Sequence, residues 1–242
     1  MGLVRAMGDP APATADAAAR AAARLVRRRF GLSLPPPFSG EPGPEEPIRV
    51  ARAEDGAAVA AVKWRVFGTS YRGLFSDRFL DNRDVVPPVS YWTGRAMVPP
   101  SRRHRLLVWG RPGTVFGYLD CGPATAALTP ADDATPTAAV GAGESAGDDH
   151  RDRSAVGEVF ELYVDPSASA VGGGTRLLEA AEDWLGRAGL ARLELSVLET
   201  NAAARTFYER RGWVDSGRRV VREVSGEHLI EARYEKGAPD SE

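Results

Sequence analysis

The chain has 242 residues, of which 43% are hydrophobic and 26% charged, a composition typical of a globular protein. Its 31 Lys and Arg against 33 Asp and Glu give a net charge of −2, so no overall attraction to nucleic acid or to an anionic membrane is expected. A single cysteine, Cys121, excludes an internal disulfide and a multi-thiolate metal site. No apolar run approaches the ~18 residues of a membrane span. We therefore expect a cytoplasmic protein without a metal cofactor.

Two segments differ in composition from the rest of the chain. Residues 1–46 are rich in Ala, Pro and Arg, and six prolines between positions 35 and 47 favour extended polyproline geometry. We expect a disordered or loosely docked extension, with an Arg-rich targeting arm as the alternative. Residues 124–154 carry six acidic residues among Ala, Gly, Thr and Pro. They are predicted to form a flexible acidic insertion, with a lid that attracts a cationic acceptor as the alternative.

Hydrophobic periodicity and turn residues predict the secondary structure of the remaining chain. The first elements are a strand at 48–53, a helix from 54 towards 67, a hairpin of strands at 104–109 and 114–119, and a strand at 156–164. The later elements are a helix at 177–188, a strand at 193–197, a short helix between Asn201 and Gly212, and a hairpin of strands at 218–224 and 228–234. One further helix is expected before the first hairpin. This order predicts a mixed α/β sheet in one domain at 47–237.

A glycine-rich loop joins the strand that ends at Val164 to the helix that follows Gly172-Gly173-Gly174. Three glycines let backbone N–H groups converge without obstruction by side chains, and the start of the helix adds unpaired N–H groups and a positive dipole end. This arrangement suits a diphosphate. Thr175-Arg176 after the last glycine excludes a P-loop, which needs Lys and then Ser or Thr. The order of elements excludes a parallel Rossmann sheet.

Two motifs resemble those of the GNAT acyltransferase superfamily. The run Leu162-Tyr163-Val164-Asp165-Pro166, with the loop through Leu178, is similar to its coenzyme-A motif. The pattern Asn201-x-x-Ala-x-x-Phe-Tyr-Glu-x-x-Gly-Trp213 resembles its second signature. The resemblance covers residues 48–236 apart from the acidic insertion. It implies a mixed, mostly antiparallel central sheet flanked by helices. It also implies transfer of an acetyl group from acetyl-CoA to a primary amine of a small molecule or protein, by a monomer or homodimer.

The resemblance also implies which residues bind the cofactor. They are Leu162, Tyr163, Val164, Gly172, Gly173, Gly174, Thr175, Asn201 and Tyr208. One position departs from the family pattern, because Ser169 stands where relatives usually carry Gln or Arg. Loss of a charge-assisted hydrogen bond predicts pyrophosphate binding that is weaker by roughly tenfold to a hundredfold. This departure motivates the alternative of a catalytically weak acyl-CoA-binding, sensing or regulatory module.

Two catalytic roles follow from the resemblance. Glu158 aligns with a strand glutamate that serves as the general base in some relatives, and we expect it to share a strand face with Phe160 and Leu162. A solvated structural glutamate is the alternative. Glu161 is expected on the opposite face as the reserve base. Tyr208 is expected to stabilise the coenzyme A thiolate, with a structural core aromatic as the alternative, and Asn201 to cap its helix and touch the cofactor.

Overall fold

The computed structural model describes residues 46–81, 87–124, 155–224 and 227–238. The extension predicted for residues 1–46 and the insertion predicted for 124–154 lie outside this part of the chain, apart from one boundary residue of each. None of the helices in the described ranges is long and apolar enough to cross a membrane.

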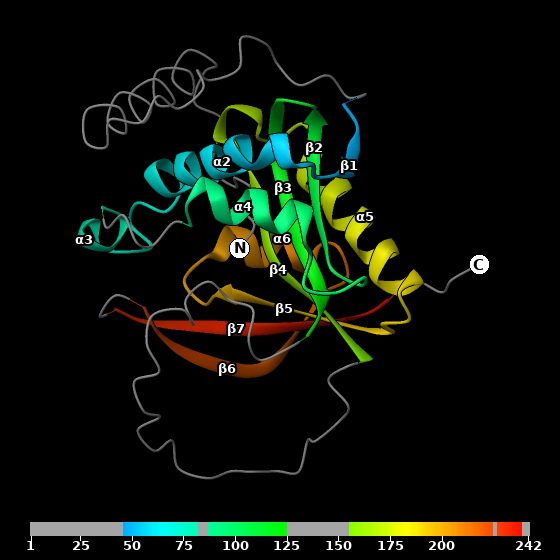
Figure 1. Ribbon diagram of the computed structural model, residues 1–242. Coiled ribbons are helices and arrows are strands. Elements are labelled where there is room, and N and C mark those ends of the chain that lie inside the picture. The colour runs from blue at the N-terminus through cyan, green and yellow to red at the C-terminus, as the bar shows by residue number, and fades with distance from the viewer. Residues whose placement is uncertain (1–45, 82–86, 125–154, 225–226, 239–242) are drawn as a thin grey trace.

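A seven-stranded sheet in the order β1-β2-β3-β4-β5-β7-β6 forms the centre of the described structure (Figure 1). Its strands are β1 (Ile48–Val50), β2 (Arg105–Arg111), β3 (Thr114–Pro123), β4 (Val156–Val164), β5 (Arg192–Leu198), β6 (Val214–Val224) and β7 (Glu227–Gly237). Each neighbouring pair is antiparallel except β4 and β5, which are parallel. This sheet, with its flanking helices, confirms the predicted fold class.

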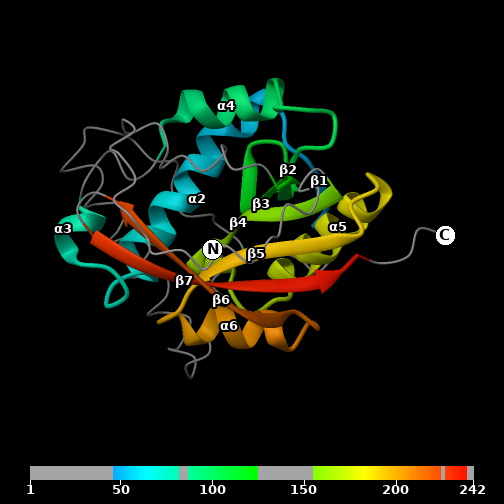
Figure 2. The same cartoon turned by 90° about the horizontal axis from the view of Figure 1, so that it is seen from below.

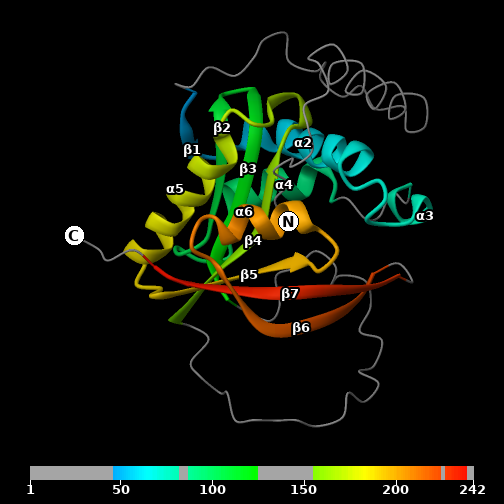
Figure 3. The ribbon, with the colours of Figure 1, turned by 180° about the vertical axis from the view of Figure 1, so that it is seen from behind.

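Helices cover both faces of the sheet, and each face has its own apolar core. The helices are α2 (Gly56–Thr69), α3 (Asp77–Leu80), α4 (Val89–Met97), α5 (Gly173–Arg187) and α6 (Ala202–Glu209), with short 3-10 turns η1 (Ala53–Asp55) and η5 (Pro166–Ala168). Figure 2 shows α2 and α4 on one side of the sheet, and Figure 3 shows α5 and α6 on the other. One buried cluster joins α5 and α6 to the strands, and a second joins α2 and α4 to the opposite face. We call these the α5/α6 face and the α2/α4 face.

The parallel strands β4 and β5 separate halfway along their length. They pair only over Val156–Val159 and Arg192–Leu195. Beyond that point β4 continues beside β3 as far as Val164, and β5 continues beside β7 as far as Leu198. Among the strands in the described ranges, none pairs with the β5-facing edge of β4 after Val159. We call this region the β4–β5 divergence.

A β-bulge in the β3–β4 pair changes which side chains share a face. Asp120 pairs with Glu161, and the next residue, Cys121, pairs with Val159, so Phe160 is the extra residue. Since one inserted residue shifts the two-residue alternation, Val159 packs in the α5/α6 cluster although Glu161, two positions later, lies on the α2/α4 face.

The bulge overturns two predictions about Glu158. Its carboxylate bonds Arg233, whose chain neighbours Ala232 and Tyr234 pack in the α5/α6 cluster, so Glu158 lies on the α2/α4 face. Leu162 packs on the α5/α6 face, so Glu158 and Leu162 do not share a face. Glu158 and Glu161 lie on the same face, and the prediction of opposite faces is wrong. The alternation rule failed because the bulge depends on pairing with β3.

Candidate functional site

Asp165 fixes the start of the loop between β4 and α5. Its carboxylate accepts hydrogen bonds from the N–H of Ser167 at 2.9 Å and from the Ser167 hydroxyl at 2.6 Å. It also accepts one from Nε of Arg65 in α2, at 2.5 Å. The side chains of Arg65 and Asp165 are 3% and 1% exposed, so this ion pair is shielded from water. The first residues of the loop are therefore held against α2.

The same loop ends in an open helix start. Ala170 and Gly172 have φ angles of +69° and +84°, in the left-handed region. Gly172 is the N-cap residue of α5, and no side chain in the described ranges caps its first turn. A Cβ at Gly173 would lie 2.3 Å from the ring of Trp109, so only glycine lets α5 begin this close to β2. The N–H groups around Gly172, Gly173 and Gly174 remain available to an anion.

Two side chains of this loop have hydroxyl groups with different partners. The Ser169 hydroxyl donates to the carbonyl of Pro166 at 3.0 Å, so it is used within the turn. Thr175, in the first turn of α5, accepts hydrogen bonds from Arg211, at 3.0 Å from Nε and also from Nη2. Sequence reasoning missed Arg211, which occupies a variable position of the second motif. Its cationic side chain was the only available signal.

Asn201 caps α6, as predicted. Its Oδ1 accepts from the N–H of Ala204 at 3.0 Å. Asn201 is 2% exposed, and its Nδ2 is buried without a hydrogen-bond partner among the described residues. A buried unpaired amide is unfavourable, so this group favours a ligand with an acceptor oxygen nearby.

Tyr208 lies in the α5/α6 core and is 1% exposed. Its ring centroid is 5.1 Å from that of Phe207, 6.2 Å from that of Trp213 and 6.5 Å from that of Tyr234. Burial raises the pKa of Tyr163 well above its usual range, and the nearby Tyr208 hydroxyl adds to this shift. Tyr208 is therefore within electrostatic range of Tyr163, on the diverging end of β4.

The two candidate carboxylates both have cationic partners. Glu158 lies immediately before the β4–β5 divergence and pairs with Nη1 of Arg233 at 2.6 Å. Glu161 accepts from Nζ of Lys63 at 2.5 Å and from the Tyr118 hydroxyl at 2.7 Å. Both of its oxygens are thus occupied, and Glu158 is the carboxylate with fewer partners.

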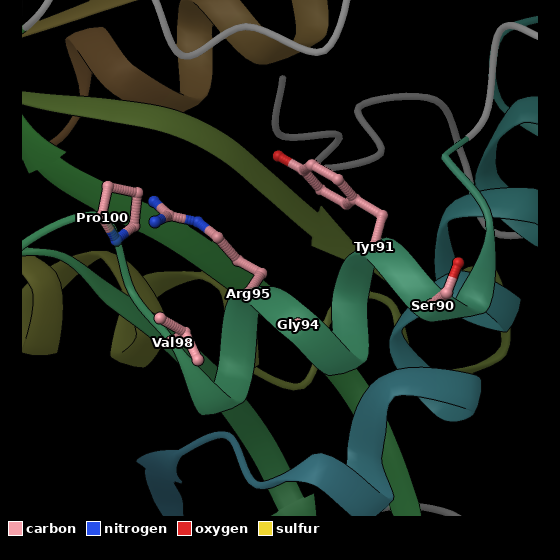
Figure 4. Close-up of a pocket in the computed structure, with 6 residues that line it drawn as sticks. All are labelled: Ser90, Tyr91, Gly94, Arg95, Val98 and Pro100. Carbon is pink, nitrogen blue, oxygen red and sulfur yellow. The ribbon is translucent and has the colours of Figure 1, made fainter.

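A cavity of about 430 Å³ lies beside α4 on the α2/α4 face (Figure 4). It is lined by Ser90, Tyr91, Gly94, Arg95, Val98 and Pro100. Arg95 bonds Asp120 through Nε and Nη2, each at 2.8 Å, and Asp120 is the register partner of Glu161. Burial, with the charges of Asp120 and Glu161, raises the pKa of Tyr91 to about 12, so its hydroxyl stays protonated at neutral pH.

His104 lies on the same face, beyond Arg95. Its ring stacks on Phe160 with centroids 6.0 Å apart, and its Nδ1 is 2.8 Å from the Ser101 hydroxyl. Burial, helped by the positive charges of Arg95 and Arg103, lowers the pKa of His104 from 6.5 to about 4. Because the folded pKa is the lower one, the stability from neutral His104 is present above pH 6.5 and is lost as the pH falls towards 4.

His104→Asn is expected to flatten the loss of stability between pH 6.5 and 4. Asn keeps a polar atom near the Ser101 hydroxyl but does not titrate, so up to about 3 kcal/mol of pH dependence disappears. Burial raises the pKa of Asp120 to about 6, which acts in the opposite direction, but Asp120 is present in both proteins. Denaturant unfolding across this pH range measures the difference. If the unfolding free energies of wild type and His104→Asn fall equally between pH 6.5 and 4, His104 is not the source of this pH dependence.

Comparison of the chain with known proteins identifies a matching family and similar proteins. A family model described as the acetyltransferase (GNAT) family matches residues 74–213. The chain is 46% identical to a mycothiol acetyltransferase of Geodermatophilus obscurus over 59 residues, which are 24% of this chain and 19% of that relative. The match thus spans about a fifth of that relative's length.

Two solved structures share the fold at low sequence identity. An N-acetyltransferase from Staphylococcus aureus Mu50 has a TM-score of 0.55 and 16% identity, covering 81% of this chain and 99% of that one. The putative acetyltransferase yncA from Salmonella typhimurium, solved with its cofactor acetyl-CoA, has a TM-score of 0.52 and 17% identity, covering 81% of this chain and 95% of that one. At such identity the likeness concerns the fold alone.

Proposed function

Because this chain belongs to the GNAT acetyltransferase family, as its two motifs predict, we propose that it transfers an acetyl group from acetyl-CoA to a primary amine. One observation carries the proposal: the uncapped, glycine-lined start of α5 lies after the strand that separates from its parallel neighbour. The acetyl-CoA bound to the yncA relative supports the choice of cofactor. We assign the domain to residues 47–237.

The residues at this site fit acetyl-CoA. The N–H groups of Gly172, Gly173 and Gly174, with Thr175, are suited to its diphosphate. Backbone groups of Leu162, Tyr163 and Val164 on the free edge of β4 are suited to the amides of its pantetheine arm. The buried Nδ2 of Asn201 offers one more donor.

In the proposed mechanism, Tyr208 and Glu158 act from opposite faces of the sheet. The thioester of acetyl-CoA supplies the acetyl group. Glu158, on the α2/α4 face, accepts a proton from the amine, because a free alkylamine with a pKa near ~10.4 is mostly protonated at neutral pH. Tyr208, from the α5/α6 face, donates a hydrogen bond to the departing thiolate. Full proton transfer from an ordinary tyrosine to a thiolate is uphill by about 2 kcal/mol, so the hydrogen bond itself is the main contribution.

We place the acceptor in the cavity beside α4. This cavity lies on the face that carries Glu158, and its Arg95 adjoins the polar pair Asp120 and Glu161. An amine that entered from this face would meet the β4–β5 divergence from the side opposite Tyr208.

Calorimetry and thiol release test the proposed function together. We expect acetyl-CoA to bind the purified full-length chain at micromolar concentration and at least one amine of a broad panel to release free coenzyme A. Binding without release from any amine favours the acyl-CoA-sensing alternative. A second panel of longer acyl-CoAs tests whether another acyl group is preferred. Absence of acetyl-CoA binding would overturn the proposal.

A further inference from the structure

Arg211 reaches from the end of α6 to the first turn of α5. Its Nε donates to Oγ1 of Thr175 at 3.0 Å, and its Nη2 donates to the same oxygen. Its Nη1 donates to the carbonyl of Phe207 at 2.7 Å, and its Cζ lies 3.7 Å from the centroid of the Phe207 ring. Contacts from two helices therefore hold the guanidinium in one orientation, which lowers the entropy lost when it binds a ligand.

Arg211 has no carboxylate within ion-pair distance in the described part of the chain. Six other arginines of the C-terminal half do have such partners, namely Arg192, Arg205, Arg218, Arg219, Arg222 and Arg233. Glu179 and Glu182 act on Arg211 only at longer range, and Glu182 already bonds Lys236 and Trp213. Burial lowers the pKa of Arg211 from its ordinary value, but an arginine remains cationic at neutral pH. Within the described residues, the guanidinium therefore lacks a paired counter-charge.

Two positive groups meet at this point. The N-terminal end of α5 carries a partial positive charge, and the guanidinium of Arg211 lies against its first turn. Like charges in a partly buried place repel, and an anion between them relieves the repulsion. Thr175 accepts two bonds from Arg211, so its own hydroxyl hydrogen is directed away from the guanidinium. The arrangement fits an oxyanion at the start of α5.

We infer that Arg211 binds the diphosphate of acetyl-CoA and supplies the cationic contact that Ser169 does not. Ser169 stands where related enzymes usually carry Gln or Arg, and its hydroxyl is used within the turn. Arg211 comes instead from the second motif and reaches the same loop through Thr175. This inference rests on the proposed function, because it takes acetyl-CoA as the ligand.

Arg211→Gln tests the inference, with Arg210→Gln as the matched control. Arg210 is the adjacent, exposed arginine, so both variants change the net charge equally. By calorimetry, we expect Arg211→Gln to raise the Kd of both coenzyme A and dephospho-coenzyme A about tenfold to a hundredfold, and Arg210→Gln to change it less than about twofold. The salt dependence of Kd is expected to become shallower only in Arg211→Gln.

Each alternative gives a different result. Equal Kd values for wild type and Arg211→Gln would overturn the inference. A loss of affinity in Arg211→Gln for coenzyme A but not for dephospho-coenzyme A would also overturn it, because the contact would then be with the 3′-phosphate. If Arg211→Gln lowers the Tm, Arg211→Lys separates a loss of charge from a loss of stability, because it keeps the positive charge. The inference requires Arg211→Lys to bind coenzyme A more tightly than Arg211→Gln does. Failure of the wild-type chain to bind acetyl-CoA would overturn the proposed function instead.

Discussion

Tyr208→Phe is expected to lower the turnover of acetyl-CoA about a hundredfold while raising its Kd less than about threefold. The ring remains in place, because its contacts with Phe207, Trp213 and Tyr234 involve the aromatic face and edges. Only the hydroxyl that we propose to stabilise the departing thiolate is removed. Steady-state kinetics with a reactive amine and calorimetry with acetyl-CoA measure the two quantities separately.

Tyr234→Phe is the control for this experiment. Tyr234 is a buried tyrosine of the same cluster, and its hydroxyl bonds Arg205 at 3.0 Å and Glu209 at 2.8 Å. Its loss should lower the Tm and leave turnover nearly unchanged. A Tyr208→Phe enzyme with wild-type turnover would remove Tyr208 from the mechanism.

Glu158→Gln tests the proposed general base. If Glu158 is the base, the acidic limb of the pH–rate profile disappears in this variant.

Sequence patterns predicted most of the sheet, but they gave one helix without bounds before the first hairpin, where the structure has both α3 and α4. The bounds of β4, Val156–Val164, agree with the prediction because a charged, small-residue segment precedes this β-rich run and Asp165-Pro166 follows it. The helix α4 has only nine residues, includes Gly94, and buries Arg95 beside Trp92. Its core-facing side is therefore partly charged, and a pattern based on hydrophobicity does not detect it. The ion pair with Asp120 that permits this burial is a tertiary contact.

The candidate site was predictable where it depends on local chain order and not where it depends on packing. The uncapped glycines and the Asn201 cap are local features of their motifs. The common face of Glu158 and Glu161 follows from a bulge defined by β3, and the contact of Arg211 with Thr175 joins residues 36 positions apart. Spacing rules within one element carry no information about either.

Asp165→Ala is expected to lower the free energy of unfolding by about 3–5 kcal/mol, the range measured when one partner of a buried ion pair is removed. The variant leaves the guanidinium of Arg65, 3% exposed, without the carboxylate that lies 2.5 Å from it. It also removes the side chain that accepts from Ser167 at the start of the loop. Because this loop leads to the proposed diphosphate site, the Kd of acetyl-CoA should rise as well.

Two further variants separate the ion pair from general effects of charge. Asp77→Asn removes a carboxylate from the exposed pair with Arg72, and should change the unfolding free energy by less than about 1 kcal/mol. Arg65→Met with Asp165→Asn removes both buried charges, and should recover part of the stability lost in Asp165→Ala, because neither member of the ion pair remains charged. Denaturant unfolding of the three proteins measures these differences. If Asp165→Ala is no less stable than Asp77→Asn, the anchoring of the loop to α2 does not depend on this ion pair.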